Sequence, residues 1–217
     1  MIITIDGKSG LGKSTIAEKL ATARHMHHIN SGKMYRYITW RALQLDQNLE
    51  TVSVCRIADE MDILAANNMG NTLLRSPEVT ANVNKISKIT AVRKRVNSVI
   101  VSQTRNGDFV LDGRDMCYVL PDANIKFVFD APIEDRIWLA TEILGKPYLK
   151  AMELIAMRDR DEPSFDYPED VIYLNPIESL RSGSSNSLDT IMKISLDTIM
   201  KIIDQNVVVN AFCNTTA

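Results

Sequence analysis

The sequence contains little of what a secreted or membrane-spanning protein needs. Only three cysteines are present, Cys55, Cys117 and Cys213, and they lie far apart without a CxxC spacing. An odd number of cysteines without a pairing pattern argues against a disulfide framework and favours reduced thiols. No apolar run approaches the roughly 20 residues that cross a bilayer, and the N-terminal residues lack the basic segment and cleavage site of a signal peptide. We therefore expect a cytoplasmic protein that has no membrane partner.

The chain also lacks an excess of charge of either sign. Its 25 Lys and Arg residues nearly balance its 27 Asp and Glu residues, which leaves a formal net charge of −2. A protein that follows a nucleic-acid backbone usually carries a basic excess, so we expect no nucleic-acid polymer as a partner. With 217 residues, 45% of them hydrophobic and 24% charged, the chain has the composition of an ordinary globular domain with its own core.

Short apolar runs alternate with helical patterns along most of the chain. Runs typical of buried strands lie at Met1–Ile5, His28–Asn30, Phe109–Leu111, Ile125–Phe129 and Val171–Leu174. Helices are predicted over Lys13–Ala23, Lys33–Gln47, Ser53–Ala66, Pro77–Ser87, Ala91–Thr104, Ile133–Leu144 and Leu149–Arg160. This alternation predicts an α/β fold with a five-stranded parallel sheet and helices on both faces. In such sheets ligands bind beyond the carboxyl ends of the strands, where Asp6, Asp112 and Asp130 are expected.

Near the C-terminus the octapeptide SLDTIMKI occurs twice in succession, at Ser187–Ile194 and Ser195–Ile202. We interpret the repeat as a local duplication that lengthens one terminal helix. Eight residues exceed two helical turns by about 80°, so the apolar stripes of the two copies do not superpose. The residues from about 206 onward are weakly patterned. We therefore expect one domain over residues 1–207 and a tail over residues 208–217.

The segment GKSGLGKST after the first predicted strand matches the phosphate-binding pattern G-x-x-x-x-G-K-[ST]. Its glycines let successive backbone N–H groups turn inward, and the helix that begins at Lys13 adds the positive end of its dipole. Lys13 would contact the β- and γ-phosphates of ATP, and the Ser14 hydroxyl would be a ligand of Mg²⁺. The expected nucleotide-binding residues are Gly7, Lys8, Ser9, Gly10, Leu11, Gly12, Lys13, Ser14 and Thr15. This P-loop alone does not distinguish a kinase from a GTPase, a motor or a transporter ATPase.

Three further segments resemble those of the bacterial cytidylate (CMP) kinases. They are INSGKMYR at 29–36, LRSPEV at 74–79, and VLDGRDM at 110–116 followed by PDA at 121–123. The combination of DGRD and PDA is the most specific of these, and the resemblance extends from Ile2 to about Asp161. It implies a P-loop NTPase of three α/β/α layers, similar to other nucleotide kinases, with an acceptor-binding arm over residues 36–75 and a lid over residues 133–161. It also favours a monomer whose partner is a small nucleotide acceptor.

The resemblance implies a role for individual residues as well. Residues expected to contact the acceptor nucleotide are Ser31, Tyr35, Arg36, Arg75, Asp112, Arg114 and Asp115. Arg36 and Arg75 would hold its phosphate, while Tyr35 would pack beneath the nucleotide. The two aspartates would face the sugar and base or help to place the metal. Residues expected to act on the transferred phosphoryl group are Lys13, Arg114, Arg136 and Arg158.

Two departures from the family leave alternatives open. The stretch between the two phosphate-binding arginines is too short for the insert that covers the pyrimidine in the family, and Trp138-Leu139-Ala140 stands where further lid arginines are expected. Transfer of the γ-phosphoryl group of ATP to CMP or dCMP is the leading hypothesis. A kinase for another or a modified nucleotide is the second, and a catalytically weakened nucleotide-binding sensor or partner subunit is the third. We expect no metal site at His25, His27 and His28, because no Cys or carboxylate nearby in sequence completes a ligand set.

Overall fold

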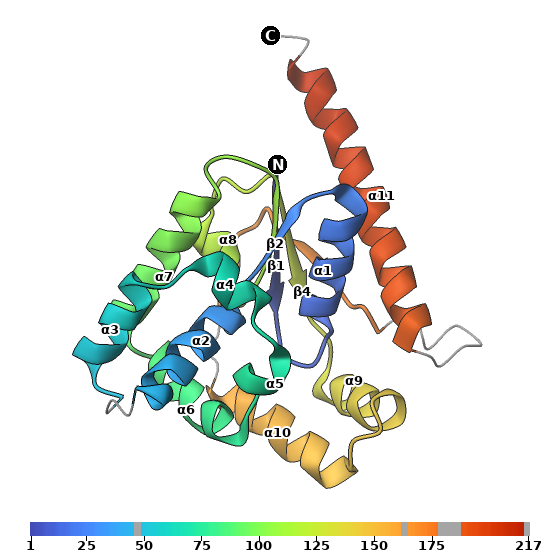
Figure 1. Cartoon of the computed structure of the whole chain (residues 1–217). Helices are drawn as coiled ribbons and strands as arrows, with labels where there is room; N and C mark the ends of the chain where they lie inside the picture. The colour runs from blue at the N-terminus through green and yellow to red at the C-terminus, as the bar shows by residue number, and fades with distance from the viewer. Residues whose placement is uncertain (46–48, 162–164, 178–187, 215–217) are drawn as a thin grey trace.

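A single parallel sheet lies at the centre of the computed structural model, which describes residues 1–45, 49–161, 165–177 and 188–214 (Figure 1). The strands formed by these residues are β1 (Ile2–Gly7), β2 (His27–Asn30), β3 (Phe109–Asp112), β4 (Ile125–Phe129) and β5 (Ile172–Leu174). Their order is β2-β3-β1-β4-β5, and each neighbouring pair is parallel. The five-stranded parallel sheet predicted from the apolar runs is therefore confirmed.

The strand order places the P-loop beside the other strand ends that carry polar residues. Strand β1 lies in the middle of the sheet, where Ile5 pairs with Asp112 of β3 and Gly7 pairs with Phe129 of β4. Because all the strands run in one direction, the segments that follow β1, β3 and β4 leave the sheet at the same edge. This edge therefore brings together residues more than 100 positions apart in the sequence.

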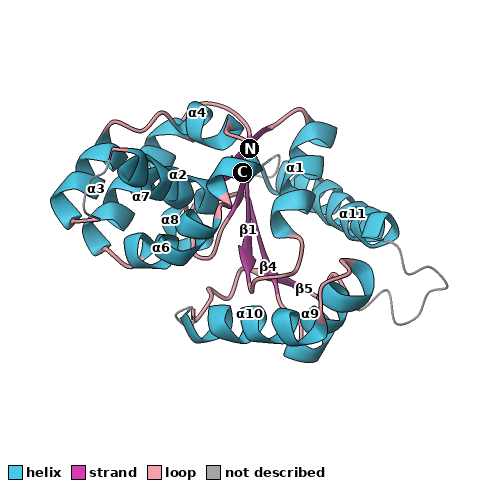
Figure 2. Cartoon of the chain, turned by 60° about the horizontal axis from the view of Figure 1, so that its bottom comes forward, coloured by secondary structure: helices cyan, strands magenta, loops and turns pink. Residues whose placement is uncertain are grey.

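One face of the sheet is covered by α1 (Lys13–Arg24) and α11 (Leu188–Asn214), which lie side by side in Figures 1 and 2. Apolar side chains of both helices, including Ile16, Leu20 and Ile199, are fully buried in one cluster with the strands. Burying such side chains stabilises the fold by about 1.5–3 kcal/mol each relative to exposure.

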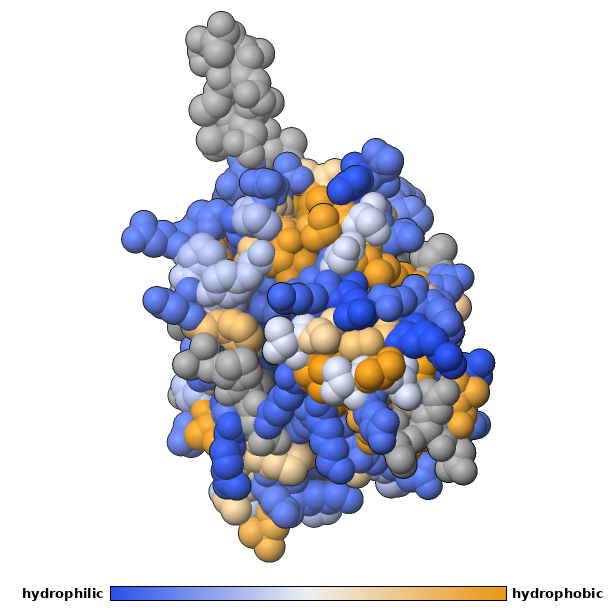
Figure 3. All heavy atoms as spheres, turned by 90° about the vertical axis from the view of Figure 1, so that its left-hand side faces the viewer, coloured by the Kyte–Doolittle hydropathy of each residue, from blue (hydrophilic) through white to orange (hydrophobic). Residues whose placement is uncertain are grey.

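The other face carries a helical lobe, formed by the helices between β2 and β3. These helices are α2 (Ser31–Gln44), α3 (Thr51–Asp59), α4 (Ile63–Asn68), α5 (Asn71–Leu74), α6 (Pro77–Ser87) and α7 (Thr90–Gln103). The lobe buries Met34, Val54 and Val96 in a second cluster that includes Leu111 of β3. Its outer face is largely hydrophilic (Figure 3), as expected of helices that bury a single apolar stripe. Helices on both faces complete the three α/β/α layers.

The helix predicted over Ser53–Ala66 is two helices in the structure, α3 and α4. The Oδ1 atom of Asp62 accepts a hydrogen bond from the backbone N–H of Ala65 at 3.2 Å, and this side chain caps the start of α4. Met61 is buried at the turn between the two helices. Because the apolar pattern of the sequence continues through this turn, the pattern alone does not reveal where α3 ends and α4 begins.

A short helix that the apolar pattern did not predict, α8 (Met116–Val119), follows the DGRD segment. The buried carboxylate of Asp6, at the end of β1, accepts the backbone N–H groups of Met116 and Cys117 at 2.9 and 2.8 Å. Burial raises the pKa of Asp6, and these two hydrogen bonds offset part of that effect. Asp6 was expected at the ligand-binding edge of the sheet, and at that edge its carboxylate caps α8.

The lid segment consists of α9 (Ile133–Trp138), a π-helical turn (Leu139–Ile143) and α10 (Tyr148–Asp161), all at the bottom of Figure 1. The helix expected over Ile133–Leu144 is α9 continued by the π-helical turn, and the one expected over Leu149–Arg160 is α10, which is one residue longer at each end. Ala140 stands at one of the positions where the family resemblance leads one to expect an arginine. It is buried with Ile137 and Ala151 in a small core of the lid itself.

The duplicated octapeptide lies in α11, except for Ser187, which is outside the described residues. Met192 of the first copy packs beside Gly12 of the P-loop, whereas the sulfur of Met200, at the same place in the second copy, lies 3.1 Å from Nε of Arg24. The helix continues to Asn214, through most of the segment expected to be a tail. Once a helix has formed and docked, extending it by one residue orders only that residue and gains one backbone hydrogen bond, so the helix extends easily.

No helix within the described part of the chain is both long and apolar enough to cross a membrane.

Candidate active site

The P-loop connects β1 to α1 by a turn that requires glycine. Gly7 has a φ of +116°, and a Cβ atom there would lie 2.0 Å from the backbone oxygen of Phe129. Gly12, with a φ of +71°, is the N-cap of α1 and provides no side chain to cap its first turn. The first N–H groups of a helix have no acceptor within the helix, so the start of α1 and its dipole favour an anion at the loop.

Two polar side chains of the P-loop are buried. Lys13 is buried, and its Nζ donates a hydrogen bond to the backbone oxygen of Lys8 at 2.6 Å. The Oγ atom of Ser9 is buried without any hydrogen-bond partner, a state that costs free energy unless a ligand supplies one. An ammonium group and an unsatisfied hydroxyl beside open backbone N–H groups fit the phosphates of a nucleotide.

A polar network joins the start of α1 to the ends of β2 and β3. The Ser14 hydroxyl donates to Oδ2 of Asp112 at 2.6 Å, and Nδ2 of Asn30 donates to Ser14 Oγ at 2.8 Å and to Asp112 Oδ2 at 3.1 Å. His28 Nε2 lies 2.6 Å from Asp112 Oδ1. Of the two predicted roles for Asp112, these contacts favour placing the metal over facing the sugar. A hydroxyl and a carboxylate oxygen are the kind of oxygen ligands that suit Mg²⁺.

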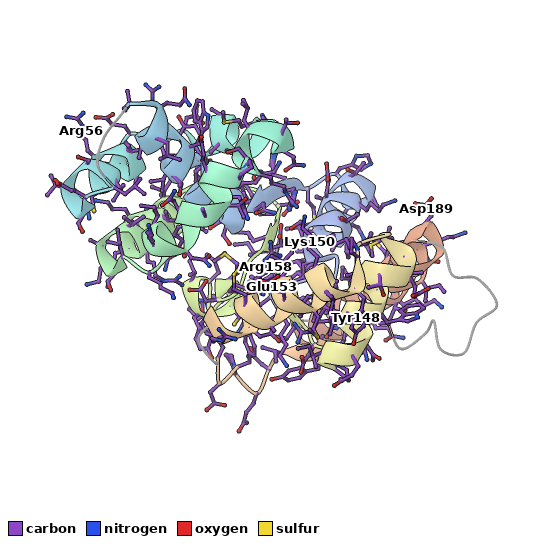
Figure 4. All side chains as sticks on the ribbon, turned by 90° about the horizontal axis from the view of Figure 1, so that it is seen from below. Arg56, Tyr148, Lys150, Glu153, Arg158 and Asp189 are labelled. Carbon is purple, nitrogen blue, oxygen red and sulfur yellow. The ribbon has the colours of Figure 1, made fainter. Side chains whose placement is uncertain are left out.

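Arg36 lies near two arginines from other elements. Arg36 of α2 donates to the backbone oxygen of Leu74 at 3.0 Å and is near Arg75, which follows α5, and Arg158 of α10. The pKa of Arg36 is lowered to about 10, mainly by burial and in smaller part by the charges of Arg75 and Arg158. Figure 4 shows Arg158 on the side of α10 that faces the rest of the molecule. An anion bound between these residues would relieve their mutual repulsion.

The DGRD segment and α7 supply a further set of contacts. Nη1 of Arg114 donates to the backbone oxygen of Gly7 at 2.6 Å, which places this arginine at the P-loop. Asp115 forms an ion pair with Arg93 of α7, and the Arg93 guanidinium lies over the ring of Tyr35, 5.9 Å from its centre. Sequence reasoning missed Arg93, because an arginine within an amphipathic helix carries no local motif. Burial raises the pKa of Tyr35 to about 12, so its hydroxyl is neutral at physiological pH.

The predicted residues Ser31 and Arg136 both bond to other groups of the protein, although Nε of Arg136 is buried without a hydrogen-bond partner. The hydroxyl of Ser31 donates to the backbone oxygen of Asp112 at 3.1 Å. Arg136 was expected to close over a phosphoryl group, but it is only 1% exposed and forms a two-fold ion pair with Asp159, with Nη1 at 2.7 Å from Oδ1. In this structure Arg136 therefore links α9 to α10 within the lid.

Comparison with known proteins agrees with these features. The sequence matches the family model described as cytidylate kinase over residues 3–163. It is 40% identical over 143 residues to a cytidylate kinase of Alkaliphilus metalliredigens and 35% identical over 150 residues to one of Symbiobacterium thermophilum. These alignments cover 62% and 63% of this chain but only 65% and 66% of the relatives, so the chain matches just under two thirds of their length.

The fold also resembles a solved structure. An uncharacterized protein from Eubacterium ventriosum superposes with a TM-score of 0.53 at 14% sequence identity, over 94% of this chain and 98% of that chain. At this level of identity the likeness concerns the fold alone.

Proposed function

This chain belongs to the cytidylate kinase family, and we propose that it transfers the γ-phosphoryl group of ATP to CMP or dCMP. The observation that carries the proposal is that Arg36, half-buried and bonded to the backbone oxygen of Leu74, lies near Arg75 and Arg158, an arrangement that would accept a second anion besides the one at the P-loop. A P-loop enzyme that only hydrolyses a triphosphate has no use for a second phosphate-binding site. A kinase with a phosphorylated acceptor requires one.

The reaction needs charge neutralisation and alignment more than covalent help from the protein. The P-loop amides and Lys13 would hold the β- and γ-phosphates, while Arg36 and Arg75 would hold the phosphate of the acceptor. An oxygen of that phosphate is already a nucleophile, so no general base is required. It forms a bond to the γ-phosphorus as the bond from that phosphorus to the β,γ-bridging oxygen breaks, and ADP leaves.

Mg²⁺ would be held by Ser14 and Asp112, where its charge would neutralise the β- and γ-phosphate oxygens. Arg114 would contribute a further positive charge, since its guanidinium is already at the P-loop. Arg158 would approach from the lid as the lid excludes water from the bound triphosphate.

We further propose that Arg93 and Asp115 contact the base. Their ion pair, in which the Arg93 guanidinium lies over the Tyr35 ring, offers a hydrogen-bond donor and an acceptor side by side. An exocyclic amino group next to a ring nitrogen, as in cytosine, is complementary to such a pair. In this chain α4 and α5 occupy the stretch in which the family insert would lie.

A coupled assay of ADP release, with ATP, Mg²⁺ and a panel of CMP, dCMP, UMP, dTMP, AMP and GMP, tests the proposed activity. Turnover restricted to CMP and dCMP, and abolished in Lys13→Ala, is the expected result. Turnover with another acceptor would keep the mechanism and change the substrate. Nucleotide binding without turnover for any acceptor would exclude the kinase and favour a sensor or partner subunit.

A pair of arginine variants tests the acceptor site itself. Loss of a charged hydrogen bond to phosphate removes about 1.5–3 kcal/mol, so we expect Arg75→Ala to raise the KM for CMP about tenfold or more and to change the KM for ATP little. Arg56→Ala is the matched control, because Arg56 is exposed at the outer end of the lobe, 3.8 Å from Glu60 (Figure 4). Equal effects of the two substitutions would contradict the acceptor site.

A further inference from the structure

Two polar residues of the edge strand β2, His28 and Asn30, contact the residues that would hold the metal. We propose that His28 and Asn30 are positioning residues, which fix Asp112 and Ser14 in the orientation that receives a divalent cation. The inference rests on the proposed function, since it concerns the metal that accompanies the nucleotide. Neither residue would touch the metal.

Side chains of β2 contact both oxygens of the Asp112 carboxylate. Oδ1 lies 2.6 Å from His28 Nε2, and Oδ2 receives hydrogen bonds from Asn30 Nδ2 at 3.1 Å and from the Ser14 hydroxyl at 2.6 Å. Asp112 is only 4% exposed, so water has little access to substitute for these donors. A carboxylate held at both oxygens by fixed donors has lost its freedom to rotate.

The hydrogen bond that the amide oxygen of Asn30 accepts fixes the orientation of the amide group. Its Oδ1 atom accepts the backbone N–H of Lys33 at 2.9 Å, as the N-cap of α2, so its NH₂ group faces Ser14 and Asp112. The Ser14 hydroxyl thus donates its hydrogen to Asp112 and uses one lone pair for the Asn30 donor at 2.8 Å. A hydroxyl oxygen has two lone pairs, and the second remains for a cation.

The backbone of the same two residues is held from the helical lobe. Asn67 of α4 accepts the backbone N–H of Asn30 at 3.0 Å through Oδ1, and its Nδ2 donates to the backbone oxygen of His28. The side chain of Asn67 therefore pairs with the exposed edge of β2 as a further strand would. Nζ of Lys33 in turn donates to the backbone oxygen of Asn67 at 2.7 Å.

Groups that orient the ligands of a metal commonly contribute a factor of about 10–100 to metal affinity. Mn²⁺ binding measured by electron paramagnetic resonance, in the presence of β,γ-imido-ATP, tests whether His28 is such a group. We expect His28→Leu to weaken Mn²⁺ binding about tenfold or more. His28→Gln, whose amide nitrogen can replace Nε2 as a donor, should recover most of the loss.

A neighbouring histidine provides the control. His27 is exposed, and its ring packs near that of Phe109 at 5.3 Å between centroids, so His27→Leu should leave Mn²⁺ affinity unchanged. Binding of β,γ-imido-ATP in EDTA, followed by calorimetry, should be the same within about twofold in all variants, because the P-loop amides and Lys13 do not depend on His28.

The outcomes separate this inference from the proposed function. Wild-type Mn²⁺ affinity in a folded His28→Leu protein would overturn the positioning role and leave the kinase proposal intact. Equal weakening of nucleotide binding in EDTA would also overturn it, since the effect would then be a general one on the fold. Failure of the wild-type protein to bind Mn²⁺ with the nucleotide would overturn the proposed function and the inference together.

Discussion

At the scale of single residues, arginine has two distinct environments in this protein. Arg36 lies near Arg75 and Arg158, and its pKa is lowered mainly by burial and also by the charges of these two arginines. Arg136, by contrast, is buried and paired with Asp159. The first arrangement costs stability until an anion binds, whereas the second holds the lid together. The number of lid arginines in the sequence is therefore a poor guide to how many reach a phosphate.

The pair of Arg136 and Asp159 gives a prediction for acid stability. Hydrogen bonding to Arg136 lowers the pKa of Asp159 below its ordinary value of 3.8. The stability that this carboxylate contributes is thus present above pH 3.8 and is lost as the pH falls through its lower pKa in the folded state. We expect Asp159→Asn to be destabilised by about 3–5 kcal/mol at neutral pH, because it leaves the Arg136 charge buried and unpaired.

Urea denaturation between pH 7 and pH 3 measures both effects. The difference in unfolding free energy between wild type and Asp159→Asn should shrink as the pH falls below 3.8. Asp6, whose raised pKa acts in the opposite direction, is present in both proteins and cancels from the difference. A difference independent of pH would show that Asp159 does not titrate with folding.

At the scale of elements, the two copies of SLDTIMKI show how packing assigns different tasks to the same sequence. Both lie in α11, and the residues at their sixth position are Met192 and Met200. Met192 is 2% exposed and packs beside the P-loop, while Met200 is only partly buried near Arg24 at the other end of α1. The offset of about 80° between the copies allows α11 to follow the length of α1 while presenting a different part of its surface at each end.

Substitution of these two methionines is a matched test of that difference. Truncating a buried methionine to alanine removes its transfer free energy and leaves a cavity, so we expect Met192→Ala to lower the unfolding free energy by about 2–5 kcal/mol. Met200→Ala should cost less than half as much, because its site is partly open to solvent. Equal losses by urea denaturation would mean that the two octapeptides are equivalent in the fold.

At the scale of the whole molecule, the helical lobe and the lid lie on opposite sides of the strand ends. Figure 2 shows α9 and α10 on one side and the helices between β2 and β3 on the other. Arg36 and Arg75 belong to the lobe and Arg158 to the lid, so the proposed acceptor site is assembled from both. A ligand that bridges them would draw the lid and the lobe together.

Small-angle X-ray scattering can test this closure. We expect β,γ-imido-ATP, CMP and Mg²⁺ together to reduce the radius of gyration, and CMP to have no such effect on Arg75→Ala. Each ligand at about 100 times its Kd should also add about 2.7 kcal/mol to the unfolding free energy. An unchanged radius of gyration in the wild-type protein, despite ligand-induced stabilisation, would indicate a site that is already closed.

The sequence alone determined the parallel sheet and the P-loop. These depend on patterns that are local to a few residues, such as the apolar run before Gly7 and the GKS that starts α1. A β-branched run ended by glycine restricts the backbone to few conformations, so local chemistry decides them.

Only the tertiary structure decided which charged residues meet. Arg93 and Asp115 are 22 positions apart, Arg136 and Asp159 are 23 apart, and His28 and Asp112 are 84 apart. An arginine on a helix and an aspartate at a strand end have many possible partners, and packing selects one of them. The same holds for the two octapeptides, since identical sequences cannot differ in local preference. Their different positions along α1 come from the register in which α11 docks on the sheet.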